Sequence, residues 1–213
     1  MNSDHTIGAG SIAGLLKSHP DAGVLWIDAH ADINTPTISP SGNMHGMPLA
    51  FLLQGLVSHS TIPGLEWMGE GPFLKKENLV YIGLRDVDSG ERKLIRELGI
   101  RAFTMQDVDR FGIGKTMEMA LDHLCGSNLR PIHMSYDIDA VDPVLAPSTG
   151  TTVRGGLTFR EALYVAEAAS ESRSLVSLDM VEVNPSLVPG HGAAITVDMA
   201  LLLISSALGN TIL

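Results

Sequence analysis

The chain has 213 residues, of which 45% are hydrophobic, and a formal net charge of −10. This composition excludes a disordered, highly charged chain, and the acidic surplus makes nucleic acids and anionic membrane surfaces poor partners. The single Cys125 excludes an internal disulfide and a paired-cysteine metal or redox site. No stretch is typical of a signal peptide or a membrane-spanning helix. We therefore expect one domain over residues 1–213 and a cytoplasmic location, with a mitochondrial one left open.

Short apolar runs alternate with helical patterns along the chain. Continuous apolar runs are typical of strands that are covered on both faces, and they predict strands at 24–27, 79–84, 131–136 and 175–183. Helical patterns predict helices at 48–57, 91–98, 107–124, 158–169 and about 193–208. This alternation predicts a three-layer α/β/α fold with a mainly parallel sheet. In such sheets ligands bind beyond the carboxyl ends of the strands.

Two details refine these elements. Thr158 and Glu161 have the spacing of a capping box, which predicts a helix start at this point. The glycine-rich stretch TIGAGSIAG (6–14) lacks the spacing of a dinucleotide-binding motif, and no strand precedes it. We expect a loop there that leads into a helix.

The strongest chemical signal is the run Asp28-Ala29-His30-Ala31-Asp32, which directly follows the first predicted strand. Because side chains alternate with period two in extended chain, Asp28, His30 and Asp32 are expected to project to one side. Asp137 and Asp139 follow the strand at 131–136 with the same spacing, and His5 could add a second imidazole. The alternative interpretation of each aspartate group is a turn in which the carboxylates cap the backbone.

Charge favours a metal site over the turn interpretation. Four ionised carboxylates in one cleft repel one another, and two divalent cations would neutralise them. Oxygen ligands with imidazole and no thiolate favour Mn²⁺ over a structural zinc site. Two such metals can share a water and lower its pKa.

The motifs that carry these residues resemble the arginases of the ureohydrolase family. They are DAHADINTPTISPSGNMHG (28–46), SYDIDAVDP (135–143), STGTTVRGGLTFREALY (148–164) and LDMVEVNPS (178–186). The similarity extends over nearly the whole chain and implies an arginase-like fold. Arginases carry a substantial segment before their first histidine ligand, whereas His5 stands almost at the start here. We therefore expect the N-terminal strands of the fold to be missing and one sheet edge to be unpaired.

The resemblance also implies a function, namely manganese-dependent hydrolysis of L-arginine to L-ornithine and urea by a metal-bridging hydroxide. Two Mn²⁺ ions per subunit would be held by six ligands. These ligands would be His5, Asp28, His30, Asp32, Asp137 and Asp139. By the same resemblance the chain would form a homo-oligomer, a trimer in the family.

The remaining roles are likewise implied by the resemblance. His45 would be the proton shuttle, and Glu182 would pair with the substrate guanidinium. The α-carboxylate would be bound by Asn34, Ser41 and Asn43, the α-amino group would lie near Asp88, and Thr151 would orient polar groups.

Two alternatives stay open. One is another ureohydrolase such as an agmatinase, against which the three carboxylate-binding residues argue because agmatine has no carboxylate. The other is a truncated, catalytically weak form that acts through binding or subunit assembly.

Overall fold

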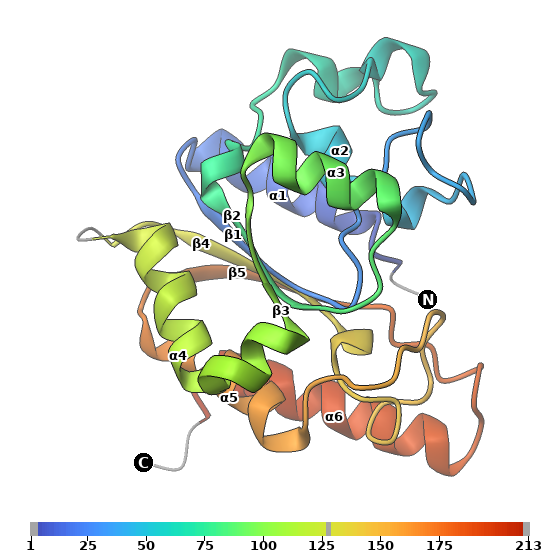
Figure 1. Cartoon of the computed structure of the whole chain (residues 1–213), viewed down its shortest axis with the longest axis vertical. Helices are drawn as coiled ribbons and strands as arrows, with labels where there is room; N and C mark the ends of the chain where they lie inside the picture. Colours follow the sequence, from blue (N-terminus) through green and yellow to red (C-terminus); the bar gives the residue numbers. More distant parts are fainter. Residues whose placement is uncertain (1–3, 127–128, 211–213) are drawn as a thin grey trace.

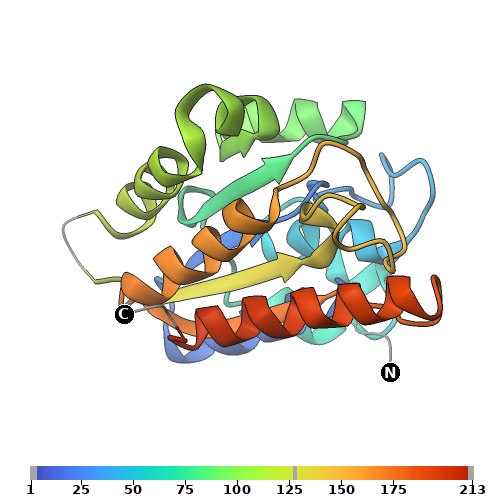
Figure 2. The same cartoon turned by 90° about the horizontal axis from the view of Figure 1, so that it is seen from below.

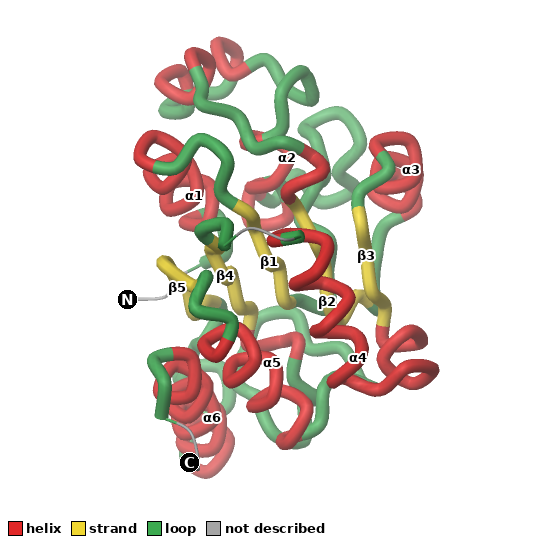
Figure 3. The backbone as a smooth tube through the Cα atoms, turned by 90° about the vertical axis from the view of Figure 1, so that its left-hand side faces the viewer, coloured by secondary structure: helices red, strands yellow, loops and turns green. Residues whose placement is uncertain are grey.

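The computed structural model describes residues 4–126 and 129–210. In this part of the chain, one parallel sheet has the strand order β3-β2-β1-β4-β5 (Figure 3). The strands are β1 (Gly23–Ile27), β2 (Leu79–Leu84), β3 (Arg101–Thr104), β4 (Ile132–Asp137) and β5 (Leu175–Val181). The crossovers are helical, which is the usual connection between parallel strands.

Helices cover both faces of the sheet. The helices are α1 (Ile7–Ser18), α2 (Pro48–Leu52), α3 (Ser89–Leu98), α4 (Met105–Cys125), α5 (Phe159–Glu171) and α6 (His191–Ala207). Figure 1 shows α1, α2 and α3 on one side of the sheet and α4, α5 and α6 on the other. Figure 2 looks onto the second side, where α5 and α6 run next to each other. The predicted three-layer α/β/α architecture is confirmed.

The core consists of two apolar clusters, one on each face of the sheet. Val24 and Trp26 of β1 belong to the cluster under α1 to α3, whereas Leu25 and Ile27 belong to the cluster under α4 to α6. All residues of β1 are buried, as expected for a central strand with helices on both faces. The carboxyl ends of β1, β2, β4 and β5 carry the polar motifs, and of these strands β1, β2 and β4 are buried throughout.

Most predicted elements are present, with differences that have physical causes. The helix predicted at 48–57 ends at Leu52, and the loop predicted over 6–14 is wrong because α1 already begins at Ile7. Gly8 is a helical residue there, and a Cβ on it would lie 3.3 Å from the Trp26 ring. Strand β3 was not predicted, since it has only four residues and only Phe103 among them is buried.

One further prediction is confirmed. The Thr158 side chain accepts a hydrogen bond from the Glu161 amide and forms the predicted capping box of α5. Within α4, Gly112 has a φ of +76° and breaks the helix. Among the described helices, none is both long and apolar enough to cross a membrane.

Candidate active site

The first group of site residues follows β1. Asp28 is fully buried, and its carboxylate accepts hydrogen bonds from the His30 amide (2.7 Å) and from Trp26 Nε1 (3.0 Å). The chain then leaves the extended conformation, and Asp32 has a left-handed φ of +49°. Asp28, His30 and Asp32 therefore gather as predicted, although the segment that carries them bends instead of extending the strand.

The second group lies at the end of β4. Asp137 is the last residue of the strand, and Asp139 lies in the 3₁₀ turn Ile138–Ala140 that follows. The Asp139 amide donates to Asp137 Oδ1 at 2.8 Å, which is the turn interaction considered as the alternative. The second oxygen of Asp137 lies 3.1 Å from His5 Nδ1. Asp137 thus caps the turn and also faces the cluster.

His5 lies at the centre of the site. Its buried ring stacks on Trp26 with a centroid distance of 4.0 Å, and Nε2 lies 2.9 Å from Ser135 Oγ. Nδ1 lies 3.1 Å from one carboxylate oxygen of each of three aspartates, which are Asp28, Asp32 and Asp137. None of these contacts makes a hydrogen bond, and one ring nitrogen could not serve three carboxylates with a single hydrogen. A buried nitrogen without a partner among converging oxygens is the arrangement that a cation satisfies.

Two sets of possible metal ligands share one residue. His5, Asp28 and Asp32 form the first set, and Asp28, His30 and Asp139 form the second, each with its ligand atoms within 4.8 Å of one another. The donors are carboxylate oxygens and imidazole nitrogens without a thiolate, which suits Mn²⁺. The residues present therefore fit a pair of divalent cations with Asp28 between them.

The pKa values of the clustered side chains also favour bound cations. Burial and the charge of Asp28 raise the pKa of Asp32 to about 7, and burial with the charges of Asp139 and Asp28 raises the pKa of Asp137. Burial alone would lower the pKa of His30, but the Asp139 and Asp28 carboxylates raise it to about 12. Protons must therefore balance the carboxylates where cations do not.

His45 and Glu182 lie next to each other at the edge of the cluster. His45 Nδ1 is 3.7 Å from Glu182 Oε1, and this carboxylate raises the pKa of His45. Glu182 also accepts a hydrogen bond from the His5 amide at 2.8 Å and has a left-handed φ of +61°. Such a backbone conformation is costly for a residue other than glycine and is held by its surroundings. It turns the chain after β5 back towards His5.

The residues expected to bind the amino acid surround a cavity of about 270 Å³ next to the metal ligands. Its lining includes Asn34, Ser41, Asn43, Asp88 and Thr151, together with His30, Asp32, His45 and Asp137. Asn34 Nδ2 donates to Asp88 Oδ2 (2.9 Å), and Thr151 donates to Asp139 Oδ2 (3.1 Å). Glu182 lies beside His45, which lines this cavity, so its carboxylate is at the edge of the same site.

Three supporting residues were missed at the sequence level. Glu91 is buried and accepts hydrogen bonds from the amides of Ile33 and Asp88. Its capping-box spacing from Asp88 could have revealed it. The contacts of Trp26 with Asp28 and of Ser135 with His5 involve strand residues, and no motif in the sequence predicts them.

Comparison with known proteins agrees with this geometry. The model of the arginase family matches residues 3–209. A sequence relative, the arginase of Glaciozyma antarctica, is 52% identical over 215 residues, which cover 100% of this chain and 61% of that protein. The chain spans between 61% and 66% of the length of the first three curated relatives that it matches.

Solved structures show the same fold. The arginase of Bacillus caldovelox matches with a TM-score of 0.89 and 40% identity, over 99% of this chain and 68% of that one. The arginase of Entamoeba histolytica, solved in complex with L-ornithine, matches with a TM-score of 0.86 and 37% identity over 98% and 68% of the two chains.

Proposed function

The chain belongs to the arginase family, and we propose that it hydrolyses L-arginine to L-ornithine and urea with the help of two Mn²⁺ ions. The observation that carries this proposal is the position of Asp28 in both sets of possible ligands, next to the unpartnered Nδ1 of His5. The L-ornithine complex of the Entamoeba histolytica relative supports the choice of substrate.

The metal pair would be held by the six residues expected from the sequence, with Asp28 common to both ions. The ligands are His5, Asp28, His30, Asp32, Asp137 and Asp139. Bound divalent cations supply Lewis acidity, which makes water acidic enough to react near neutral pH. Trp26 and Ser135 hold Asp28 and His5 in place, and such supporting hydrogen bonds keep ligands oriented.

The substrate would be bound by the cavity next to this cluster. Asn34, Ser41 and Asn43 offer neutral donors to a carboxylate, and Asp88 offers a charge opposite to that of an α-ammonium group. Asn34 is already oriented by its hydrogen bond to Asp88. Together these residues would hold the amino-acid end of the substrate and leave the guanidinium end towards the metal ligands.

His45 would handle the proton of the leaving group. Its side chain is 33% exposed, so it reaches both the cavity and solvent, and Glu182 raises its pKa. An imidazole that is partly protonated near neutral pH can give a proton to the departing amine. Glu182 would keep that ring oriented, in addition to the contact with the guanidinium that the family resemblance implies.

The proposal is tested by urea release from the manganese-loaded chain, with L-arginine and agmatine compared at equal concentrations. We expect release from L-arginine and little from agmatine, since agmatine has no carboxylate for the three neutral donors. A preference for agmatine would favour an agmatinase-type enzyme. Bound metal without urea from either substrate would favour a form that acts through binding or assembly.

A matched pair of variants links activity to the cluster. Asp137→Asn removes a carboxylate oxygen that faces His5, and we expect it to abolish both manganese binding and urea release. Asp198→Asn makes the same chemical change at an exposed position on α6 and should leave both unchanged. Full turnover in Asp137→Asn would remove the metal assignment.

A further inference from the structure

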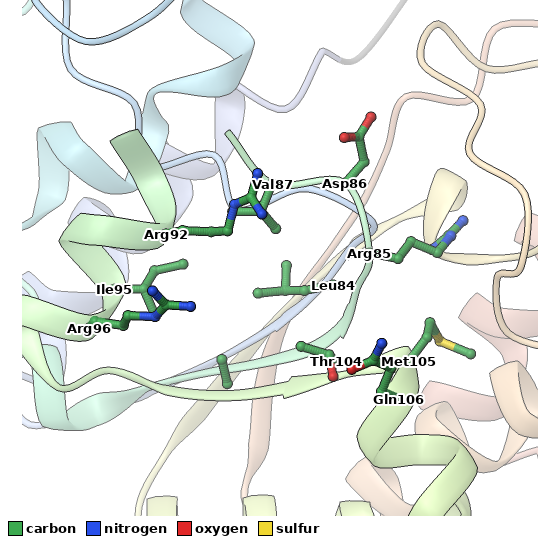
Figure 4. Close-up of a pocket in the computed structure, with 11 residues that line it drawn as sticks. Leu84, Arg85, Asp86, Val87, Arg92, Ile95, Arg96, Thr104, Met105 and Gln106 are labelled. Carbon is green, nitrogen blue, oxygen red and sulfur yellow. The ribbon is translucent and has the colours of Figure 1, made fainter. Parts of the chain in front are cut away.

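A second, larger cavity lies on the other side of the β2–α3 loop (residues 85–88). Its volume is about 480 Å³, within the range of small-molecule sites. The walls come from the end of β2, this loop, α3, β3 and the first turn of α4 (Figure 4). Asp86 borders both this cavity and the one beside the metal ligands. We call this second space the α3 cavity.

Two arginines of α3 define the charge of the α3 cavity. Arg92 and Arg96 are one helical turn apart, and Figure 4 shows both side chains projecting to the same side of α3, with Ile95 between them. Both residues are exposed. Among the described residues, neither guanidinium has an ion-pair or hydrogen-bond partner. Two like charges at this spacing repel each other.

Two other cations of the same region, Lys93 and Arg85, are already neutralised or bonded. Lys93, on the same helix, pairs with Glu97 at 3.8 Å. The Arg85 guanidinium donates to backbone carbonyls, including those of Asp139 (2.6 Å) and Val153 (2.8 Å). The Asp86 carboxylate points away from Leu84 in Figure 4. In a chain with a net charge of −10, Arg92 and Arg96 place two guanidinium groups without an ion-pair partner among the described residues on one wall of the α3 cavity.

The rest of the lining combines apolar and polar residues. Leu84 is 3% exposed and forms the floor, with Ile95 and Ala102 beside it. Gln106 lies on the opposite wall and adds a neutral carboxamide. The Thr104 hydroxyl is engaged with Asp107 at the start of α4. The cavity therefore offers a cationic side, an apolar floor, one neutral polar group and, at its border with the smaller cavity, the acidic Asp86.

We propose that the α3 cavity binds a small molecule with a carboxylate or phosphate group and a short apolar body. The anionic group lies on Arg92 and Arg96, because guanidinium groups match both oxyanions with paired hydrogen bonds. The apolar body covers Leu84 and Ile95. This site is separate from the metal ligands, so the proposal does not depend on the proposed hydrolysis of arginine.

The test titrates the manganese-loaded chain with hexanoate, with butyl phosphate and with acetate, and follows binding by calorimetry. Hexanoate and butyl phosphate have the same kind of apolar body with different anionic groups, whereas acetate lacks the body. We expect saturable binding of hexanoate or butyl phosphate at one site per chain, and weaker binding of acetate. The anionic group that binds more tightly identifies the ligand class.

Two variants of α3 make the test specific. Arg96→Gln should weaken binding about tenfold, the loss expected for a hydrogen bond to a charged group. Lys93→Gln removes the same charge from the same helix outside the cavity and should change binding by less than about twofold. Thermal unfolding of both variants checks that they are folded.

Three results would overturn the proposal. They are no saturable binding of either hexanoate or butyl phosphate, equal effects of Arg96→Gln and Lys93→Gln, and binding that Arg96→Gln leaves unchanged. The last result would place the anion elsewhere, for example at the neutral donors of the smaller cavity.

Discussion

At the scale of single residues, the proposed proton donor His45 is distinct from the proposed metal ligands. His45 is absent from both ligand sets, and its ring faces Glu182 at 3.7 Å. We predict that His45→Asn lowers kcat about a hundredfold, the usual contribution of a general acid or base, while the bound manganese per chain is unchanged. Steady-state urea release and metal analysis of the same preparation measure both.

The matched control for this change is His191→Asn. His191 is exposed at the start of α6, so both kcat and metal content should stay at wild-type values. Loss of manganese in His45→Asn would show that His45 belongs to the metal site. Unchanged kcat would remove its role as proton donor.

The sequence predicted single site residues well where the motif follows a strand directly. Asp28 and Asp137 each stand at a strand end, so the parallel sheet brings them to one edge without knowledge of the loops. Glu182 has a left-handed backbone conformation that turns it towards His5 and His45, and its contact with the guanidinium stays a prediction. A backbone conformation of this kind leaves no pattern in the residue types, and it could not have been predicted.

At the scale of elements, α1 supports the candidate metal site through one close contact. Gly8 allows the helix to approach Trp26, whose indole stacks on His5 and donates to Asp28. We predict that Gly8→Ala displaces Trp26 and weakens manganese binding about tenfold, the scale observed when residues that orient metal ligands are changed. Metal titration followed by urea release measures the effect.

Gly14→Ala provides the control on the same helix. A Cβ at Gly14 meets nothing within 4 Å, so this variant should gain the ordinary helix preference of alanine, about 0.5–1 kcal/mol in free energy of unfolding. Its manganese affinity should equal that of the wild type. Equal manganese affinities in both variants would show that the packing of Gly8 on Trp26 does not affect the position of the metal ligands.

The loop that follows Thr151 is held by backbone hydrogen bonds to the side chain of Asp142. The carboxylate of Asp142 accepts backbone hydrogen bonds from Gly155 (2.8 Å), Gly156 (3.1 Å) and Val144 (3.1 Å). Burial alone would raise the pKa of Asp142, but these bonds and the charge of Arg85 lower it. The ionised form therefore stabilises the fold.

We predict that Asp142→Asn lowers the free energy of unfolding by about 1–2 kcal/mol at pH 7. The backbone amides donate to both carboxylate oxygens of Asp142, whereas an asparagine side chain has only one oxygen that can accept. The folded-state pKa lies below the value of about 3.9 for an unfolded aspartate, so the stabilisation is complete above about pH 4 and is lost as pH falls through the lowered pKa. Urea unfolding of metal-free wild type and variant should show a constant difference from pH 7 to 5 and a narrowing one below pH 4. A difference that grows towards low pH would contradict this account.

The predictability of the elements depends on how much of each is buried. Strands β1, β2 and β4 are buried throughout and match the predicted ranges within one residue at each end. Strand β3 was not predicted, and the N-terminal half of α1 was predicted to be a loop. The first has little buried surface, and the second has glycines that are typical of loops. Gly8 is used for close packing against Trp26, and such a contact depends on the partner strand and not on the local sequence.

At the scale of the whole molecule, the cluster of proposed metal ligands joins three distant parts of the chain. His5 precedes α1, Asp28 to Asp32 follow β1, and Asp137 and Asp139 follow β4. Bound cations would therefore hold the N-terminal helix to the centre of the sheet. The remaining contacts of α1 with the sheet are mainly those of the apolar cluster that it shares with Trp26.

We predict that removal of manganese with a chelator lowers the Tm by about 10 °C, because a ligand at a thousandfold excess over its Kd stabilises the folded state by about 4 kcal/mol. Hydrogen exchange should increase first at the start of α1, where His5 is tied to the cluster, and change least in α4, which packs on the opposite face. Added Mn²⁺ should restore both the Tm and the protection, and Asp137→Asn should respond to neither chelator nor metal. A uniform increase in exchange over α1 and α4 would show that the metals stabilise the fold globally and do not specifically fasten the N-terminal helix.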